Sequence, residues 1–192
     1  MVHAIAHIEF NAINLAWDAV YRFRNLPADF YSDWIGVAED EALHYQLLSG
    51  RLQDTGHAYG DFPAHNGLWE MACKTADDVL LRMALVPRVL EARGLDVTPT
   101  MIERLHQAGD KQTAVILGRI LDDEIGHVRA GSRWFRYVCR QRGLDPVKTF
   151  ADLLQQHLPG HNIMNLNTSA RRQAGFSREE IDMLEQMGGA GT

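Results

Sequence analysis

The chain has 192 residues, of which 46% are hydrophobic and 23% are charged, and its formal net charge is −6. This composition is typical of a globular domain with a substantial core and excludes a disordered or fibrous chain. The acidic balance argues against a surface that binds nucleic acid or an anionic membrane. No apolar run approaches the roughly 20 residues that cross a bilayer, and the start MVHAIAHIEF lacks the basic segment of a signal peptide. Because Cys73 and Cys139 form no CxxC pair, we expect a reducing, cytoplasmic location.

The first part of the chain is predicted to form two long helices. Apolar residues recur every three or four positions, and no stretch alternates β-branched residues. Helices are expected over residues 2–25 and 28–54, separated at Leu26-Pro27. A polar connection follows over residues 56–74, with one helical turn around Trp69. The first helix leaves no room for a cap, so we expect that a further segment precedes it in the natural protein.

The middle of the chain is predicted to hold an interrupted helix. Thr75, with Asp78 three positions later, is expected to cap it. The sequence GLDVT at residues 94–98 is expected to break this helix, and the helical pattern resumes from Pro99. Because irregular backbone inside a helix often marks a functional opening, one hypothesis is that the break admits a substrate or dioxygen. An ordinary connection between helices is the alternative.

The last part of the chain has clear helix boundaries. Asp110 is predicted to begin a long helix that ends near Arg142, before a glycine. Asp145-Pro146 begins a short helix, with proline at the first helical position. Ser177-Arg-Glu-Glu180 is the capping box of a final one. We therefore predict an all-α chain in which residues 1–142 form a helical bundle and residues 143–192 form a helical extension packed on it.

The sequence Glu-x-x-His occurs three times, and residues at i and i+3 share one face of a helix. Glu103 and its partner His106 lie on the polar side of an amphipathic pattern, so we expect this pair to be solvated. The pairs Glu41–His44 and Glu124–His127 instead interrupt apolar stripes. Ionisable groups there are costly unless something neutralises them. A divalent metal ion is the simplest neutralising partner.

Two single glutamates complete the pattern. Glu9 and Glu91 also lie on apolar stripes, and each precedes the glutamate of the following Glu-x-x-His by about one helical hairpin. At about 1.5 Å rise per residue, a hairpin brings each pair to levels that agree within about one turn. The resulting order Glu, Glu-x-x-His, Glu, Glu-x-x-His resembles the ligand set of the ferritin-like dimetal-carboxylate superfamily.

This resemblance covers roughly residues 2–140 and implies a ferritin-like four-helix bundle with a long crossover connection between helices 2 and 3, followed by a short C-terminal helical appendage. It implies two metal ions, bridged or chelated by the two Glu-x-x-His glutamates, with the single glutamates as terminal ligands. The implied ligands are Glu9, Glu41, His44, Glu91, Glu124 and His127. Four carboxylates and two neutral imidazoles balance two divalent ions, and oxygen-rich ligation favours iron or manganese (Fe/Fe, Mn/Fe or Mn/Mn) over zinc. Asp40 and Asp123 each precede a ligand glutamate and could orient a ligand histidine from outside the metal centre; exposed acidic residues are the alternative.

More narrowly, the runs HIEFNAI, DEALH, DEIGH and GDFPAHNGLWE resemble a bacterial ferritin-like family known only as a domain of unknown function. Three functions fit the implied site: an oxidoreductase that activates dioxygen or peroxide, a ferroxidase or iron-handling protein, and a metal-binding module without turnover. We favour the first, a hydroxylase-like enzyme with an unknown small-molecule substrate and unknown catalytic residues. The long extension disfavours a closed storage cage. The absence of a CxxC pair argues against an electron relay through a rubredoxin-type iron.

For the partners, Arg171-Arg172 is one of few features that would suit nucleic acid, so neither nucleic acid nor a membrane is expected. A homodimer is left open.

Overall fold

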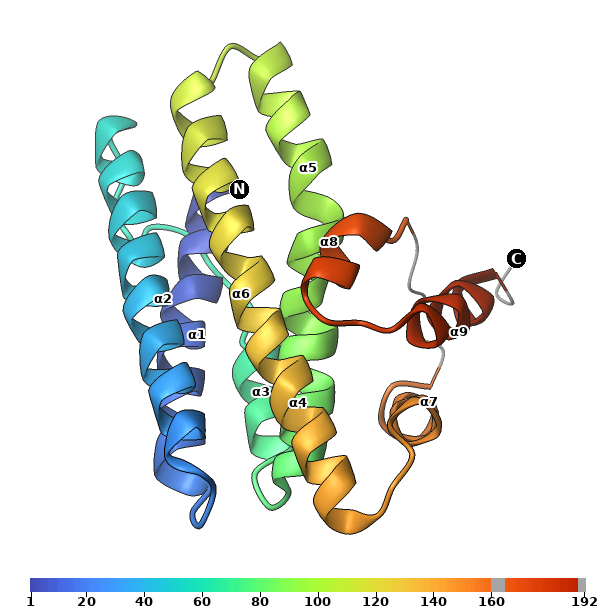
Figure 1. Ribbon diagram of the computed structural model, residues 1–192. Coiled ribbons are helices and arrows are strands. Elements are labelled where there is room, and N and C mark those ends of the chain that lie inside the picture. The colour runs from blue at the N-terminus through green and yellow to red at the C-terminus, as the bar shows by residue number, and fades with distance from the viewer. Residues whose placement is uncertain (160–164, 190–192) are drawn as a thin grey trace. The chain divides into compact units, whose positions relative to one another are not determined.

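The computed structural model describes residues 1–159 and 165–189, and within these residues all regular secondary structure is helical (Figure 1). The prediction of an all-α chain is therefore confirmed. The chain divides into two compact units, one made of residues 1–76 and 98–123 and the other of residues 77–97 and 124–192. Among the residues described, no helix is both long and apolar enough to cross a bilayer.

Unit 1 is built on two long helices that pack against each other, α1 (Val2–Arg22) and α2 (Ala28–Asp54) (Figure 1). The bounds of α2 are those predicted, whereas α1 ends three residues early. Phe23 is already extended and Asn25 has a φ of 64°, which a helix cannot accommodate. Tyr31 stabilises this turn, since its hydroxyl donates to the Phe23 carbonyl and accepts from the Leu26 amide, both at 3.2 Å.

Short and partial helices complete unit 1. The predicted turn around Trp69 is α3 (Gly67–Lys74), which packs on α1. Helix α5 (Ala92–Gln107) enters the unit at residue 98, and α6 (Lys111–Arg142) belongs to it up to residue 123. Asp110 accepts a hydrogen bond from the Thr113 amide at 3.0 Å, which confirms it as the start of α6.

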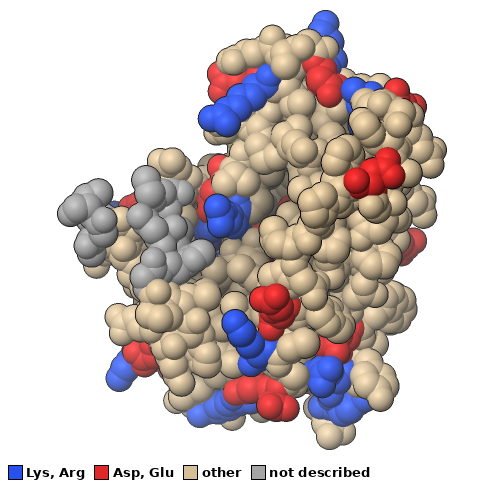
Figure 2. Space-filling model, turned by 180° about the vertical axis from the view of Figure 1, so that it is seen from behind, with Lys and Arg blue, Asp and Glu red and all other residues tan. Residues whose placement is uncertain are grey.

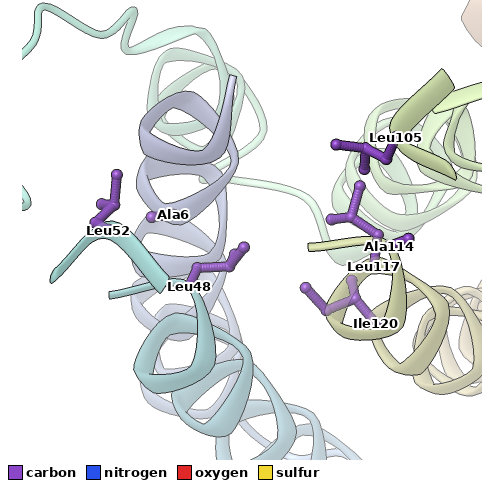
Figure 3. Close-up of a cluster of buried hydrophobic side chains, with 7 residues drawn as sticks. All are labelled: Ala6, Leu48, Leu52, Leu105, Ala114, Leu117 and Ile120. Carbon is purple, nitrogen blue, oxygen red and sulfur yellow. The ribbon is translucent and has the colours of Figure 1, made fainter. Parts of the chain in front are cut away.

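Apolar side chains from α1, α2, α5 and α6 form a buried cluster in unit 1 (Figure 3). On α2 and α6, which each contribute more than one residue, a spacing of four or three positions places these side chains on the inward face. The members of the cluster are Ala6, Leu48, Leu52, Leu105, Ala114, Leu117 and Ile120.

Unit 2 begins with α4 (Val79–Leu85), which passes directly into a π-helix, η1 (Val86–Glu91). The cap of α4 is Asp78, whose side chain accepts from the Leu80 amide at 2.8 Å. Thr75 was predicted as the cap, and this is wrong: Thr75 ends α3, and its hydroxyl donates to the Met71 carbonyl at 2.8 Å. The extended backbone of Asp78 suits an N-cap, which the helix-ending geometry of Thr75 does not.

The predicted break at residues 94–98 is also wrong, because α5 is continuous there. Pro99 cannot donate to the Leu95 carbonyl, which normally weakens a helix. The side-chain amide of Asn167 donates to this carbonyl instead, at 3.2 Å. The irregular backbone lies earlier, in η1, where Pro87 has no N–H for the preceding turn. The hypothesis of an opening at residues 94–98 loses its structural basis.

The C-terminal helices belong to unit 2, and those capped by Asp145 and by Ser177 begin as predicted. Asp145 caps α7 (Pro146–His157), and a short helix, α8 (Thr168–Gln173), follows. The capping box of α9 (Arg178–Gly189) is confirmed: the Glu180 amide donates to the Ser177 hydroxyl at 3.1 Å, and the Ser177 amide to the Glu180 carboxylate at 2.8 Å. Helix α7 packs on α4. Residues 160–164 and 190–192 of the predicted extension lie outside the described residues.

The charged side chains are mixed on the face seen in Figure 2, where Lys and Arg alternate with Asp and Glu. Of the two arginines that would suit nucleic acid, Arg172 is exposed, whereas Arg171 is buried in an ion pair with Asp96. Arg171 is therefore part of the interior of unit 2.

Candidate metal centre

Three of the predicted ligands meet in the interior of unit 1. Glu41 and His44 of α2 are fully buried, and Glu9 of α1 is 5% exposed. The Nδ1 atom of His44 lies 3.1 Å from Glu9 Oε2 and 3.3 Å from Glu41 Oε2. The i,i+3 spacing places Glu41 and His44 on one face, and the packing of α1 on α2 brings Glu9 to the same level.

The other side of the His44 ring is held by Asp123. Its Oδ2 atom lies 3.2 Å from His44 Nε2, and Arg119 Nε donates to the same oxygen at 2.5 Å. Because Nε2 donates to Asp123, Nδ1 faces the two glutamates. Nδ1 donates to them when the ring is protonated, and in a neutral ring its lone pair would be available to a cation bound beside them. The ring is thus oriented as a metal-ligating histidine is oriented.

The electrostatics of this group reflect its burial. Desolvation, followed by the charge of Glu41, raises the pKa of Glu9 to about 8. Burial alone would lower the pKa of His44, but hydrogen bonds to Glu41 and Glu9 outweigh it and raise that pKa to about 10. Burial opposes ionisation of Asp123 as well, yet hydrogen bonds from Arg119 and His44 lower its pKa. Positive charge is therefore favoured beside the buried carboxylates, as a proton or as a cation.

Unit 2 carries a second Glu-x-x-His pair on α6. Glu124 and His127 are both buried, and His127 Nδ1 lies 3.3 Å from Glu124 Oε1. The other carboxylate oxygen of Glu124, Oε2, is buried and makes no hydrogen bond among the residues described. A buried oxygen of this kind is costly unless a ligand or ion binds it. This atom fits a metal ligand better than a structural carboxylate.

Glu91 is the last residue of η1, and two contacts define its level along α6. Asp78 pairs with Arg142 at 2.7 Å. Nine residues after Asp78, Pro87 packs on Gly131, where an added Cβ would lie 2.3 Å from the proline Cγ. The two segments therefore run antiparallel, and the same register places half-buried Glu91 level with His127.

Four of the six predicted ligands form a group whose ligand atoms all lie within 4.8 Å of one another. All four side chains are buried, and three carboxylates with one imidazole are a donor set that can hold a divalent ion. The members are Glu9, Glu41, His44 and Glu124. Glu91 and His127 are not members of this group.

The remaining predicted residues have separate surroundings. Asp40 is half-buried. The hydrogen bond that Arg119 donates to Asp123 raises the pKa of Arg119, and the charge of Asp40 adds to this effect. Glu103 and His106 are exposed, as predicted for a solvated pair. The sequence analysis missed Arg119, although its i,i+4 spacing to Asp123 could have indicated the ion pair.

Comparison with known proteins gives a family but no reaction. Residues 1–182 match the family described as "Protein of unknown function (DUF455)". The chain is also similar to an uncharacterized protein of Haemophilus influenzae, with 49% identity over 193 residues that cover 97% of this chain and 67% of that protein. No solved structure matches the chain. A function for this chain is therefore inferred from the site itself.

Proposed function

We propose that this chain, which belongs to the DUF455 family of unknown function, is a dinuclear iron or manganese carboxylate protein with a ferritin-like bundle. The observation that carries the proposal is the buried group of Glu9, Glu41, His44 and Glu124, with its ligand atoms within 4.8 Å of one another. A buried acidic cluster of this density needs positive charge to be stable. Two divalent ions supply that charge and suit these ligand types.

In this proposal each unit contributes one Glu and one Glu-x-x-His. Glu9, Glu41 and His44 of unit 1 would hold one ion, and Glu91, Glu124 and His127 of unit 2 would hold the other. The free Oε2 atom of Glu124 supports this assignment, because a second carboxylate oxygen without a hydrogen bond is available to a second ion.

The proposed activity is that of a hydroxylase-like oxidoreductase with a small-molecule substrate. Bound iron or manganese would supply the electrons that reduce dioxygen or peroxide. The protein's own residues hold the centre in place and exclude bulk water, since Glu41 and His44 are fully buried. Asp123 keeps the His44 ring in one orientation through the 3.2 Å contact to Nε2. We place the protein in the cytoplasm, because Cys73 and Cys139 are both free thiols.

Oxygen consumption tests this activity. The protein is loaded anaerobically with Fe(II) and mixed with dioxygen and an excess of reductant in an oxygen electrode. We expect sustained consumption by the wild type and by Glu103→Gln, an exposed glutamate of the same motif, and loss of consumption in His44→Ala.

Other outcomes favour the alternative functions. Uptake that stops after the first oxidation and leaves many ferric ions in a cage-sized assembly would favour iron handling. A metal-loaded chain that consumes neither dioxygen nor peroxide would favour a binding module without turnover.

A further inference from the structure

The π-helix that ends in Glu91 contains a fully buried arginine. The Arg88 guanidinium carbon lies 4.5 Å from the ring centre of Phe135, 4.1 Å from that of Phe150 and 4.6 Å from that of Phe176. Arg88 Nη2 donates to Glu180 Oε1 at 2.6 Å, and both side chains are almost completely excluded from solvent. Phe135 of α6 and the C-terminal residues Phe150, Phe176 and Glu180 thus form an aromatic and acidic cage around one side chain of η1.

The residues after Glu91 are held from the same C-terminal segment. Arg171 donates to both carboxylate oxygens of Asp96, at 3.0 and 2.6 Å, and also to the Ala92 carbonyl at 3.4 Å. The backbone amide of Asn167 donates to Asp96 Oδ1 at 2.9 Å. Arg171 and Asp96 have side-chain exposures of only 3% and 5%. The C-terminal segment therefore binds the chain on both sides of Glu91, at Arg88 and at Asp96.

Glu180 connects these contacts to the start of α9. One of its carboxylate oxygens binds Arg88, and the other accepts from the Ser177 amide in the capping box. The capping bond by itself stabilises only the start of α9. The additional bond to the buried Arg88 guanidinium couples the first turn of α9 to η1.

A π-helix is rare and occurs mostly as a single turn within an α-helix, frequently at a functional site. It contains one extra residue, so its conversion to α-helix would rotate Glu91 by about 100° relative to the helix on one side. In some proteins a buried ion pair fixes a particular conformation although it adds little net stability. The ion pairs of Arg88 and Asp96 are of this kind, and they lie before and after Glu91, at the end of the turn whose geometry decides where Glu91 points.

We propose that Asn167, Arg171, Phe176 and Glu180 form a C-terminal clamp that positions the Glu91 carboxylate for metal binding. The clamp residues are positioning residues, because they act through the backbone of η1 and α5 rather than by touching a metal ion. This inference rests on the proposed function, since it assigns Glu91 to one of two ions. The clamp lies entirely within unit 2, as do Glu91 and the Glu-x-x-His pair of α6.

Titration with Mn²⁺ under anaerobic conditions, with free Mn²⁺ measured by electron paramagnetic resonance, tests the clamp. Glu180→Gln loosens it before Glu91, and Asp96→Asn loosens it after Glu91. Glu179→Gln, an exposed neighbour in the same helix, is the matched control. We expect the wild type and the control to bind two ions. Each clamp variant should bind one ion with unchanged affinity and the second about 10- to 100-fold more weakly.

The outcomes separate the two proposals. Folded variants that bind both ions like the wild type would overturn the clamp, because a merely structural role lowers the melting temperature without changing Mn²⁺ binding. A wild-type chain that binds no Mn²⁺ would overturn the proposed function and the clamp with it.

If neither variant folds, amide exchange in the wild type decides the question. A clamp that positions Glu91 must itself be stabilised by the metal, so Mn²⁺ should slow exchange over residues 167–180. Unchanged exchange there would overturn the clamp.

Discussion

Gly131 on α6 packs closely against Pro87 of η1. A Cβ atom at this position would lie 2.3 Å from Pro87 Cγ and 2.4 Å from Pro87 Cβ. Carbon atoms in ordinary contact are about 3.5–4.0 Å apart, so Gly131→Ala creates an overlap of more than about 1 Å. The proline ring cannot move aside by changing rotamer. The overlap must therefore displace α6 from η1.

The expected change in stability follows from two opposing effects. Overpacking of this kind costs about 1–3 kcal/mol, and a rigid proline partner places Gly131→Ala near the upper end. The gain in helix propensity from glycine to alanine returns about 0.5–1 kcal/mol. We therefore expect Gly131→Ala to lower the free energy of unfolding by about 2 kcal/mol. Gly118→Ala in the same helix should raise it by about 0.5 kcal/mol, because nothing lies within 4 Å of the added atom.

Urea unfolding followed by circular dichroism at 222 nm measures both variants against the wild type. Opposite signs for the two substitutions are the expected result. If Gly131→Ala is as stable as Gly118→Ala, the close approach of α6 to η1 is wrong. The register that places Glu91 level with His127 would then lose one of its two contacts.

Glu180→Gln removes the charged partner of a buried guanidinium, so we expect the free energy of unfolding to fall by about 3–5 kcal/mol; equal urea midpoints for Glu180→Gln and exposed Glu179→Gln would contradict this. Burial alone would raise the pKa of Asp78, but hydrogen bonds from Arg142 and the Leu80 amide outweigh it and lower that pKa below its usual 3.8. The stability that Asp78 contributes is therefore present above pH 3.8 and is lost as the pH falls through the folded-state pKa. Melting temperatures should accordingly differ between wild type and Asp78→Asn near neutral pH and converge in acid, and a gap that persists in acid would refute the ion pair.

Much of the fold was predictable because helix boundaries depend on residues within one or two turns of the helix end. Helix α2 follows a proline and ends before a glycine-containing connection. Aspartates cap α6 and α7, and a capping box begins α9. The predicted break at residues 94–98 failed for the opposite reason. A donor from Asn167, 72 positions from Leu95, repairs the backbone around Pro99, and a contact so distant in sequence leaves no local pattern.

The candidate site likewise contains features that local sequence predicts and features that depend on contacts distant in the sequence. Glu9, Glu41 and His44 could be selected from the sequence because ionisable groups on apolar stripes are rare, and the structure brings these three together. The ion pair of Arg119 with Asp123 could have been predicted from their i,i+4 spacing on a helix. The π-helix could not, since Pro87 predicts only that a helix is disturbed and not in which way. The cage around Arg88 depends on elements that meet only in the folded chain.

The metal content of the purified protein decides whether the chain holds two metal ions. The chain is purified without chelators, and iron and manganese are measured by elemental mass spectrometry in the wild type, in Glu41→Ala/Glu124→Ala and in the exposed control Glu103→Ala. We predict about two iron or manganese ions per chain in the wild type and the control, and almost none in a double variant that keeps its helical circular dichroism. A folded wild type that carries neither metal, or a double variant that carries as much as the wild type, would contradict the account. The buried carboxylates and His44 would then form a polar core that is neutralised by shared protons.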